Sequence, residues 1–356
     1  MGVDADVIIG LAGAFPADAV ELQLPDVASA QRLVEARRPD FAELLGARRE
    51  RLLGAFGRQL AEPLACTERA LAVGLARFGL RHGSWGSDYH HYHNENHALE
   101  VLDGRLGRLM DQIGLDALGA SDWLALSMFA TCHDLRQREA IDFRHPIGNN
   151  EAASIAETGR ILALAGFEPQ RDRKLFLALE LMIAGSTCDA RPAPAEDNPA
   201  EIVASGGALA PKLALLLDAE RPGWRADADL VGAVELARIA SDLDTANVGE
   251  PLVWLAESAS RLCQEREMRS GRKLETAASG PPCIGFLSDG QERYFFDLHR
   301  FCSEPGRATF AAAKQANAER VRTMSAQLRA RWTPRSGPRN GLEVLAEFSA
   351  LALSAA

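Results

Sequence analysis

Apolar residues recur at helical spacing along most of the chain, and few stretches alternate with the period of two that strands require. The segment 41–60 is typical, with Leu45, Leu52 and Phe56 on one predicted helical face. The same spacing predicts helices at 66–80, 89–113, 121–134, 150–166, 170–186, 207–219 and 227–246, a long helical region at 284–332 and a tail helix at 342–356. The pattern therefore predicts an all-α fold.

Prolines and weak periodicity set the two ends of the chain apart. Residues 1–40 contain Pro16, Pro25 and Pro39 and little sustained pattern, which predicts an arm that is partly irregular. The segment TPRSGPRNG before the tail helix predicts a linker. We therefore expect an N-terminal arm at 1–40, a helical domain at 41–332, and a linker with a tail helix at 333–356.

Charge and cysteine content narrow the classes of partner. The formal net charge of −10 argues against a nucleic acid or an anionic membrane, because both are bound through clustered positive charge. The six cysteines are dispersed without a C-x-x-C pair, so they indicate neither a disulfide framework nor a zinc ribbon. No stretch approaches the ~20 apolar residues of a membrane span. We expect a cytoplasmic protein with a small-molecule substrate, and whether it forms a homodimer stays open.

Five of the eight histidines fall between His90 and His133, within an alanine- and leucine-rich background. His93 and His97 are four residues apart, so both rings project from one face if the segment is helical. The next predicted helix delivers His133 and Asp134 at its C-terminal end. Because imidazole and carboxylate are the ligands of zinc, iron and manganese, this arrangement predicts a metal site.

A further acidic residue on a later apolar helix, Asp242, completes a set of two histidines and two aspartates. Its neighbour Asp244 fits better as a helix C-cap or a solvated residue, so we assign the ligand role to Asp242. Glu151 has two interpretations of equal weight. It reaches water molecules on the metal, or it is an ordinary acid in the first turn of a helix.

Three short motifs now fit together: Y-H-N-x-x-H-A at 92–98, H-D at 133–134 and S-D-L at 241–243. They resemble the HD-domain superfamily, and within it the catalytic domain of class I 3′,5′-cyclic nucleotide phosphodiesterases. The resemblance covers roughly residues 60–330 and implies an HD-domain, PDEase-like helical bundle. It also implies that a first metal ion is held by His97, His133, Asp134 and Asp242, with Asp134 bridging to a second ion.

The chemistry of phosphodiester hydrolysis agrees with these implied roles. A metal ion lowers the pKa of water, so that hydroxide is available as a nucleophile at neutral pH. We expect two divalent ions, with Zn, Fe or Mn at the tight site and Mg or Mn at the second. The resemblance assigns His93 as the general acid, and an imidazole close to a ligand residue is well placed to protonate the departing oxygen.

The resemblance also implies a substrate pocket, with a glutamine that hydrogen-bonds a purine and a phenylalanine stacked on the base. Gln291 with Phe295 or Phe296 fits these places, and Tyr92 is assigned to the substrate as well. The leading expectation is hydrolysis of a 3′,5′-cyclic nucleotide. Two alternatives stay open, a nucleotide phosphomonoesterase of the HD type and a non-catalytic HD module that binds a nucleotide. The intact His93 argues against the second, because a binding module has no need of an acid.

Overall fold

The computed structural model describes residues 15–140, 146–189, 206–332 and 337–355. Helices make up nearly all the regular structure in these ranges. Strands β1 (Cys188–Asp189) and β2 (Gly207–Ala208) form a short antiparallel pair. The prediction of an all-α fold is therefore confirmed. None of the helices in the described ranges combines the length and the apolar character needed to cross a membrane.

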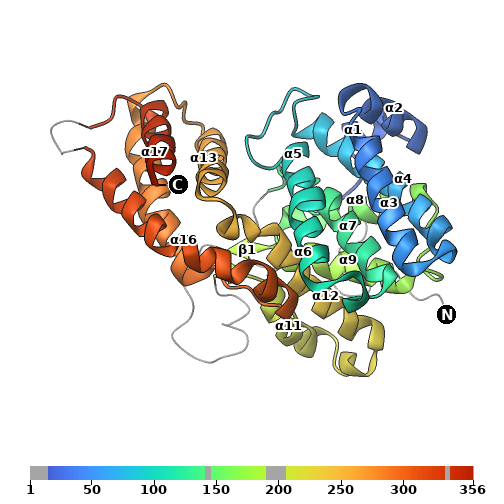
Figure 1. Cartoon of the computed structure of the whole chain (residues 1–356). Helices are drawn as coiled ribbons and strands as arrows, with labels where there is room; N and C mark the ends of the chain where they lie inside the picture. The colour runs from blue at the N-terminus through green and yellow to red at the C-terminus, as the bar shows by residue number, and fades with distance from the viewer. Residues whose placement is uncertain (1–14, 141–145, 190–205, 333–336, 356) are drawn as a thin grey trace. The chain divides into compact units, whose positions relative to one another are not determined.

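The chain folds into two compact units, and Figure 1 labels many of their helices. The first unit holds the chain up to Tyr89 and from His93 to Asp244. The second holds His90–Tyr92 and the chain from Thr245 onwards. This division differs from the predicted boundaries at residues 40 and 332, because the segments at both ends pack into a unit and the separation falls after residue 244.

The first unit is a bundle in which α4, α7, α9 and α12 pack against one another, and Figure 1 shows α9 beside α12. Its helices are α1 (Ala19–Gln23), α2 (Val27–Arg37), α3 (Phe41–Phe56), α4 (Ala61–Arg81), α5 (Glu95–Leu99), α6 (Leu106–Ile113), α7 (Ala120–Cys132), α8 (Asn149–Ala165), α9 (Arg173–Ser186), α11 (Leu213–Glu220) and α12 (Ala228–Asp244).

Helix α7 lies in the interior of this unit. All its residues from Trp123 to Cys132 are buried, and a helix that is apolar on nearly all sides has to be enclosed by others. It approaches α4 closely at Gly74, where a Cβ atom would lie 2.8 Å from Oγ1 of Thr131. The residues that follow Cys132 are therefore delivered to the inside of the bundle.

The segment before residue 40 is more regular than the expected arm. Helix α1 begins after Asp18, whose side chain accepts hydrogen bonds from two backbone N–H groups. Helix α2 begins after Asp26 in the same way and buries Ala30 and Val34. Because this buried stripe consists of only two small residues, apolar periodicity does not reveal it.

The second unit has its own apolar core, and its long helices are coloured orange to red in Figure 1. The predicted tail helix belongs to this core, since Val344 and Phe348 are buried against the other helices. The first of those helices, α13, was not predicted. The helices are α13 (Leu252–Arg269), α14 (Gly280–Gly285), α15 (Gln291–Arg293), α16 (Glu304–Ala330) and α17 (Gly341–Ala355), with π-helical turns at Phe286–Gly290 and Tyr294–Leu298.

The helix that carries the first histidine motif begins at Glu95 rather than at Tyr89. Asn94 is its N-cap, and Oδ1 of Asn94 accepts a hydrogen bond of 2.9 Å from the N–H of Asn96. The helix continues from α5 through a π-helical segment, Glu100–Arg105, into α6. His93 therefore precedes the helix, and the prediction that His93 and His97 share one helical face is wrong.

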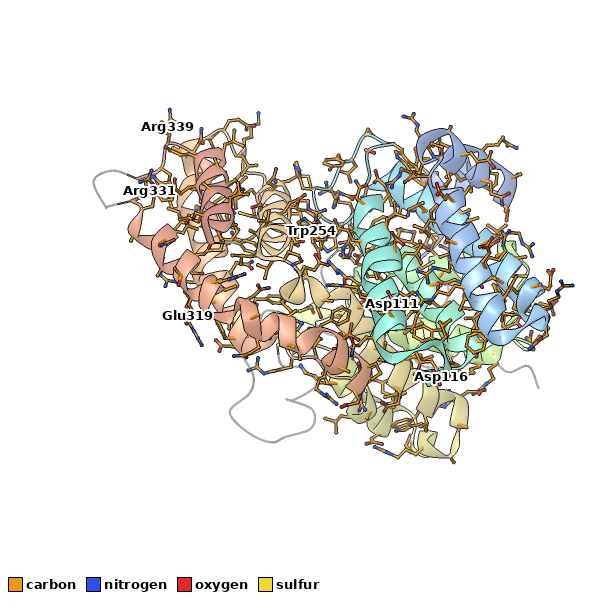
Figure 2. All side chains as sticks on the ribbon, in the orientation of Figure 1. Asp111, Asp116, Trp254, Glu319, Arg331 and Arg339 are labelled. Atoms are coloured by element: carbon orange, nitrogen blue, oxygen red, sulfur yellow. The ribbon has the colours of Figure 1, made fainter. Side chains whose placement is uncertain are left out.

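Charged side chains cover the outer surfaces of both units, as Figure 2 shows for Asp111 on α6 and Glu319 on α16, which are exposed. Such residues need no partner, because water solvates them. A charged group inside the bundle is different, since burial is costly unless the group is paired or binds an ion. The buried charges of the first unit therefore need an explanation.

Candidate metal centre

Two histidines and two aspartates meet inside the first unit. His97 lies on α5, His133 directly follows α7, Asp134 is the next residue, and Asp244 ends α12. Both imidazoles are buried, with 0% and 1% of their residues' surface exposed, while the carboxylates are slightly more accessible. We call these four residues the histidine–aspartate cluster.

The donor atoms of this cluster converge. Nε2 of His97 lies 3.6 Å from Oδ2 of Asp134 and 3.2 Å from Oδ1 of Asp244. Nε2 of His133 lies 3.0 Å and 3.4 Å from the same two oxygens. Ligands at about 2.1 Å from a tetrahedral ion are roughly 3–3.5 Å apart. Each of these four distances between an imidazole and a carboxylate therefore fits two ligands of one ion.

Backbone and aromatic contacts hold the ring of His133. Nδ1 lies 3.1 Å from the carbonyl oxygen of Phe129, and the ring stacks on the Phe129 ring with 4.5 Å between centroids. Because a carbonyl oxygen only accepts, Nδ1 carries a hydrogen and Nε2 is the atom left for an ion. That Nε2 is buried and makes no well-directed hydrogen bond within the described residues.

The two carboxylates stay acidic in spite of their burial. Burial raises the pKa of Asp134, but the charges of His133 and His93 lower it to about 2. Burial also raises the pKa of Asp244, and the adjacent imidazoles of His133 and His97 lower it well below its ordinary value. Both aspartates are therefore negative at neutral pH.

The two imidazoles respond differently to this negative charge. Burial lowers the pKa of His97, so the ring is neutral at neutral pH. Burial acts in the same direction on His133, but the charges of Asp134 and Asp244 raise its pKa well above the ordinary value. The cluster thus gathers two negative charges around one proton, a place that a divalent cation can take.

Asp244, which the sequence analysis did not assign to the site, is an acid of α12 that faces the imidazoles. Asp242 lies two residues before the end of α12 and is also buried. Its predicted role as a ligand stays a prediction. The position of Asp244 depends on the rotation of α12 about its axis, which sequence spacing does not reveal.

His93 lies beside the cluster without being part of it. Its ring centroid is 6.2 Å from that of His97, and the two rings are nearly perpendicular. Its charge also acts on Asp134. The neighbourhood of His93 and His97 thus comes from the non-helical segment before α5 and not from one turn of a helix.

Two further residues lie near Asp134. Gln137 donates a hydrogen bond of 2.9 Å from Nε2 to Oδ1 of Asp134 and so orients the carboxylate, a role that the sequence analysis missed. Burial raises the pKa of Glu151 to about 7, and the charge of Asp134 adds to the rise. The Glu151 carboxylate also folds back over Gly148, where a Cβ would be only 2.1 Å from Oε2. Both interpretations of Glu151 therefore stay open.

The three predicted substrate residues belong to the second unit. The backbone N–H of Tyr92 donates to Oε2 of Glu265 at 3.1 Å. Gln291 begins α15 and is half-buried. Phe295 is buried in the core of this unit, with its ring 4.9 Å from that of Phe296. Core packing accounts for Phe295, and a contact between any of these residues and a substrate stays a prediction.

Comparisons with known proteins add no relative. No protein-family model matches this chain, and neither a curated protein nor a solved structure matches it. A proposal for its function therefore rests on the chemistry of the cluster and on the sequence motifs. Two imidazoles and two carboxylates form a donor set that suits zinc, iron or manganese. The buried group of His97, His133 and Asp134, whose donor atoms lie within 4.8 Å of one another, could hold such an ion.

Proposed function

We propose that this protein is a metal-dependent phosphohydrolase, and that its substrate is a 3′,5′-cyclic nucleotide. The observation that supports the metal is the convergence of the histidine–aspartate cluster at one buried point. The support for a phosphoester is the resemblance of the three histidine and aspartate motifs to the HD-domain superfamily.

In this proposal the cluster holds a divalent cation through Nε2 of His97 and His133 and the carboxylates of Asp134 and Asp244. A second ion, Mg or Mn, binds beside Asp134. When bound, the metal supplies hydroxide at neutral pH and neutralises charge on the phosphoryl oxygens. Gln137 keeps the Asp134 carboxylate in place through its hydrogen bond to Oδ1.

His93 is the general acid of the proposal. Phosphodiester cleavage leaves a ribose oxygen that needs a proton, and imidazole titrates near the working pH. The residue is half-buried, and the proposal requires that solvent reprotonates its ring after each turnover. Its position 6.2 Å from the His97 ring is close enough to serve a substrate held at the cluster.

The test is metal content together with hydrolysis, measured on the purified protein, Asp134→Ala and Asp116→Ala. Asp116 is an exposed aspartate outside the cluster and serves as the matched control. We expect about one tightly bound transition metal ion per chain in the wild type and in Asp116→Ala, with hydrolysis stimulated by added Mg or Mn. Asp134→Ala should lose both the ion and the activity.

Substrate class is decided by assaying cyclic nucleotides beside nucleoside monophosphates. Release of a nucleoside monophosphate from a cyclic nucleotide supports the proposal. Release of inorganic phosphate from the monophosphates alone would replace it by a phosphomonoesterase. A wild-type protein that binds no metal, or an Asp134→Ala variant with full activity, would overturn it.

A further inference from the structure

Arg105 is a positive charge completely enclosed in the first unit, with 0% of the residue exposed. A guanidinium stays protonated in proteins, so its burial is costly unless acceptors surround it. Arg105 ends the π-helical segment that follows α5, and its Nη2 lies 3.9 Å from Oε2 of Glu100. Its side chain also donates to backbone carbonyls.

Those acceptors lie at the end of α12. Nη1 of Arg105 donates to the carbonyl of Leu243 at 3.2 Å and to the carbonyl of Asp244. The last carbonyls of a helix have no partner inside the helix, and a cation near them also interacts favourably with the helix dipole. Arg105 thus caps α12 from a segment 138 residues away in the sequence.

The residue that is capped is a member of the histidine–aspartate cluster. The Asp244 carbonyl accepts from Arg105, while its carboxylate lies 3.2 Å from Nε2 of His97 and 3.4 Å from Nε2 of His133. Rotation or fraying at the last residue of a helix would turn this carboxylate away from the imidazoles. The hydrogen bonds from Arg105 oppose that movement.

The π-helical segment explains how one continuous helix can contact both the carboxylate and the backbone carbonyl of Asp244. Seven residues make about two turns of an α-helix, and a π turn contains one more residue than an α turn. His97 and Arg105 are eight residues apart with the π-helical segment Glu100–Arg105 between them. The extra residue brings both side chains to the same face, where α12 ends.

We propose that Arg105 is a positioning residue of the metal centre, holding the end of α12 so that the Asp244 carboxylate faces His97 and His133. The proposal rests on the proposed metal site. It concerns metal affinity and not the identity of the substrate. The contacts on which it rests are those of Arg105 with the carbonyls of Leu243 and Asp244.

The experiment compares Co²⁺ affinity and the Co²⁺ absorption spectrum of the metal-free wild type, Arg105→Met and Arg48→Met. Arg48 is the matched control, since it is also an arginine that donates to a backbone carbonyl, that of Leu102, and to Ser127 Oγ at 3.1 Å. We expect Arg105→Met to weaken Co²⁺ binding about 10–100-fold, the usual effect of removing a partner that orients a ligand. Its spectrum should also change, because Asp244 no longer completes the coordination, while Arg48→Met keeps the wild-type affinity and spectrum.

Two more variants keep the test decisive. Arg105→Lys retains the charge but not the fork of donors, so it should fold and bind Co²⁺ with an intermediate affinity. In an Asp244→Ala background, Arg105→Met should cause almost no further loss, because the residue through which it acts is already missing. Wild-type Co²⁺ affinity in Arg105→Lys and Arg105→Met, or an equal loss in Arg48→Met, would overturn this inference. The proposed function would not be affected by that result. A wild type without Co²⁺ binding would overturn the proposed function together with it.

Discussion

Two buried groups of charged residues lie in the first unit, and they are built in opposite ways. The arginine–glutamate cluster consists of Glu21, Arg77, Arg81 and Glu157. There, Nη1 of Arg77 is 3.2 Å from Oε2 of Glu21, and Nη2 of Arg81 is 2.9 Å from Oε2 of Glu157. The histidine–aspartate cluster has no arginine among its members and gathers imidazoles and carboxylates around one point.

The two clusters differ in what balances their charge. A buried guanidinium is a permanent cation, so the arginine–glutamate cluster balances its charge with its own side chains. The histidine–aspartate cluster has two carboxylates and balances them with a proton on His133, which a metal ion can displace. A self-paired cluster supports the fold, whereas the donor set of the histidine–aspartate cluster could also hold a metal ion. Each prediction below changes one cluster, or a residue beside it, and includes a control for its specificity.

The largest expected effect is the loss of metal on Asp244→Asn. This change keeps the shape of the side chain but removes the negative charge next to both imidazoles. Metal affinity should fall by at least about 100-fold, more than the loss of an outer partner. Asp242→Asn is the matched control and should change the affinity by less than about threefold. Chelator competition measures both, and the reverse result would favour the ligand role predicted for Asp242.

The second effect separates metal binding from proton transfer beside the same cluster. His93→Ala should keep the ion, because its ring lies beside His97 without being placed among the ligands. Turnover of a cyclic nucleotide should fall by about 10²–10⁴-fold, the usual contribution of a positioned general acid. A nitrophenyl phosphodiester has a leaving group that needs no proton, so its hydrolysis should suffer much less. Equal losses for both substrates would show that His93 is not the acid.

The third prediction breaks the arginine–glutamate cluster. Arg77→Met leaves Glu21 and Glu157 buried without this cation, and removing one partner of a buried pair costs about 3–5 kcal/mol. The free energy of unfolding in urea measures the loss. Arg49→Met is the control, because Arg49 pairs with Glu68 at the surface and should contribute about 0–1 kcal/mol. The folded fraction of Arg77→Met should bind metal with wild-type affinity, and a comparable loss of affinity would contradict the division of roles.

The sequence predicted the helices better where their buried stripes are large. Helix α3 follows the spacing of its leucines, and α7 is apolar enough to be assigned from its composition alone. Helix α2 buries only two small residues, and α13 mixes apolar positions with many charged ones, so neither gives a strong periodic signal. The π-helical segment Glu100–Arg105 could not be predicted either. A π turn contains one more residue than an α turn, and the spacing of apolar residues does not show where this residue is inserted.

The candidate site was predicted only in part, because the sequence shows residue types but not how the helices pack. His97, His133 and Asp134 were chosen because metal ligands have characteristic residue types, and the structure brings their donor atoms within 4.8 Å. Asp244 was not predicted, because its orientation depends on the rotation of α12, which the packing of that helix determines. Gln137 and Arg105 act through hydrogen bonds to a ligand residue, and no spacing rule connects Arg105 with a carbonyl 139 residues away. Residues that orient ligands therefore become visible only in three dimensions.

The smallest expected effect concerns acid stability at the edge of the arginine–glutamate cluster. Asp18 pairs with Arg81 at 2.7 Å. Burial raises the pKa of Asp18, but hydrogen bonding to Arg81 and the Glu21 N–H, with the charges of Arg81 and Arg136, lowers it from 3.8 to about 2. A folded-state pKa below the unfolded one stabilises the protein above the unfolded value, and this stability is lost as the pH falls through the folded pKa.

The stabilisation by Asp18 should therefore be complete at neutral pH and disappear between about pH 4 and pH 2. Its size is about 1 kcal/mol, because a full shift of this kind is about 2 kcal/mol and partial solvent exposure screens much of it. The measurement is the difference in unfolding free energy between the wild type and Asp18→Asn, in chelator, at several pH values. Since Asp18→Asn cannot titrate, the other carboxylates largely cancel in this difference. A constant difference from pH 7 to pH 2 would mean that the Arg81 pair does not perturb Asp18, and a difference that depends on added metal would mean that the two clusters are coupled.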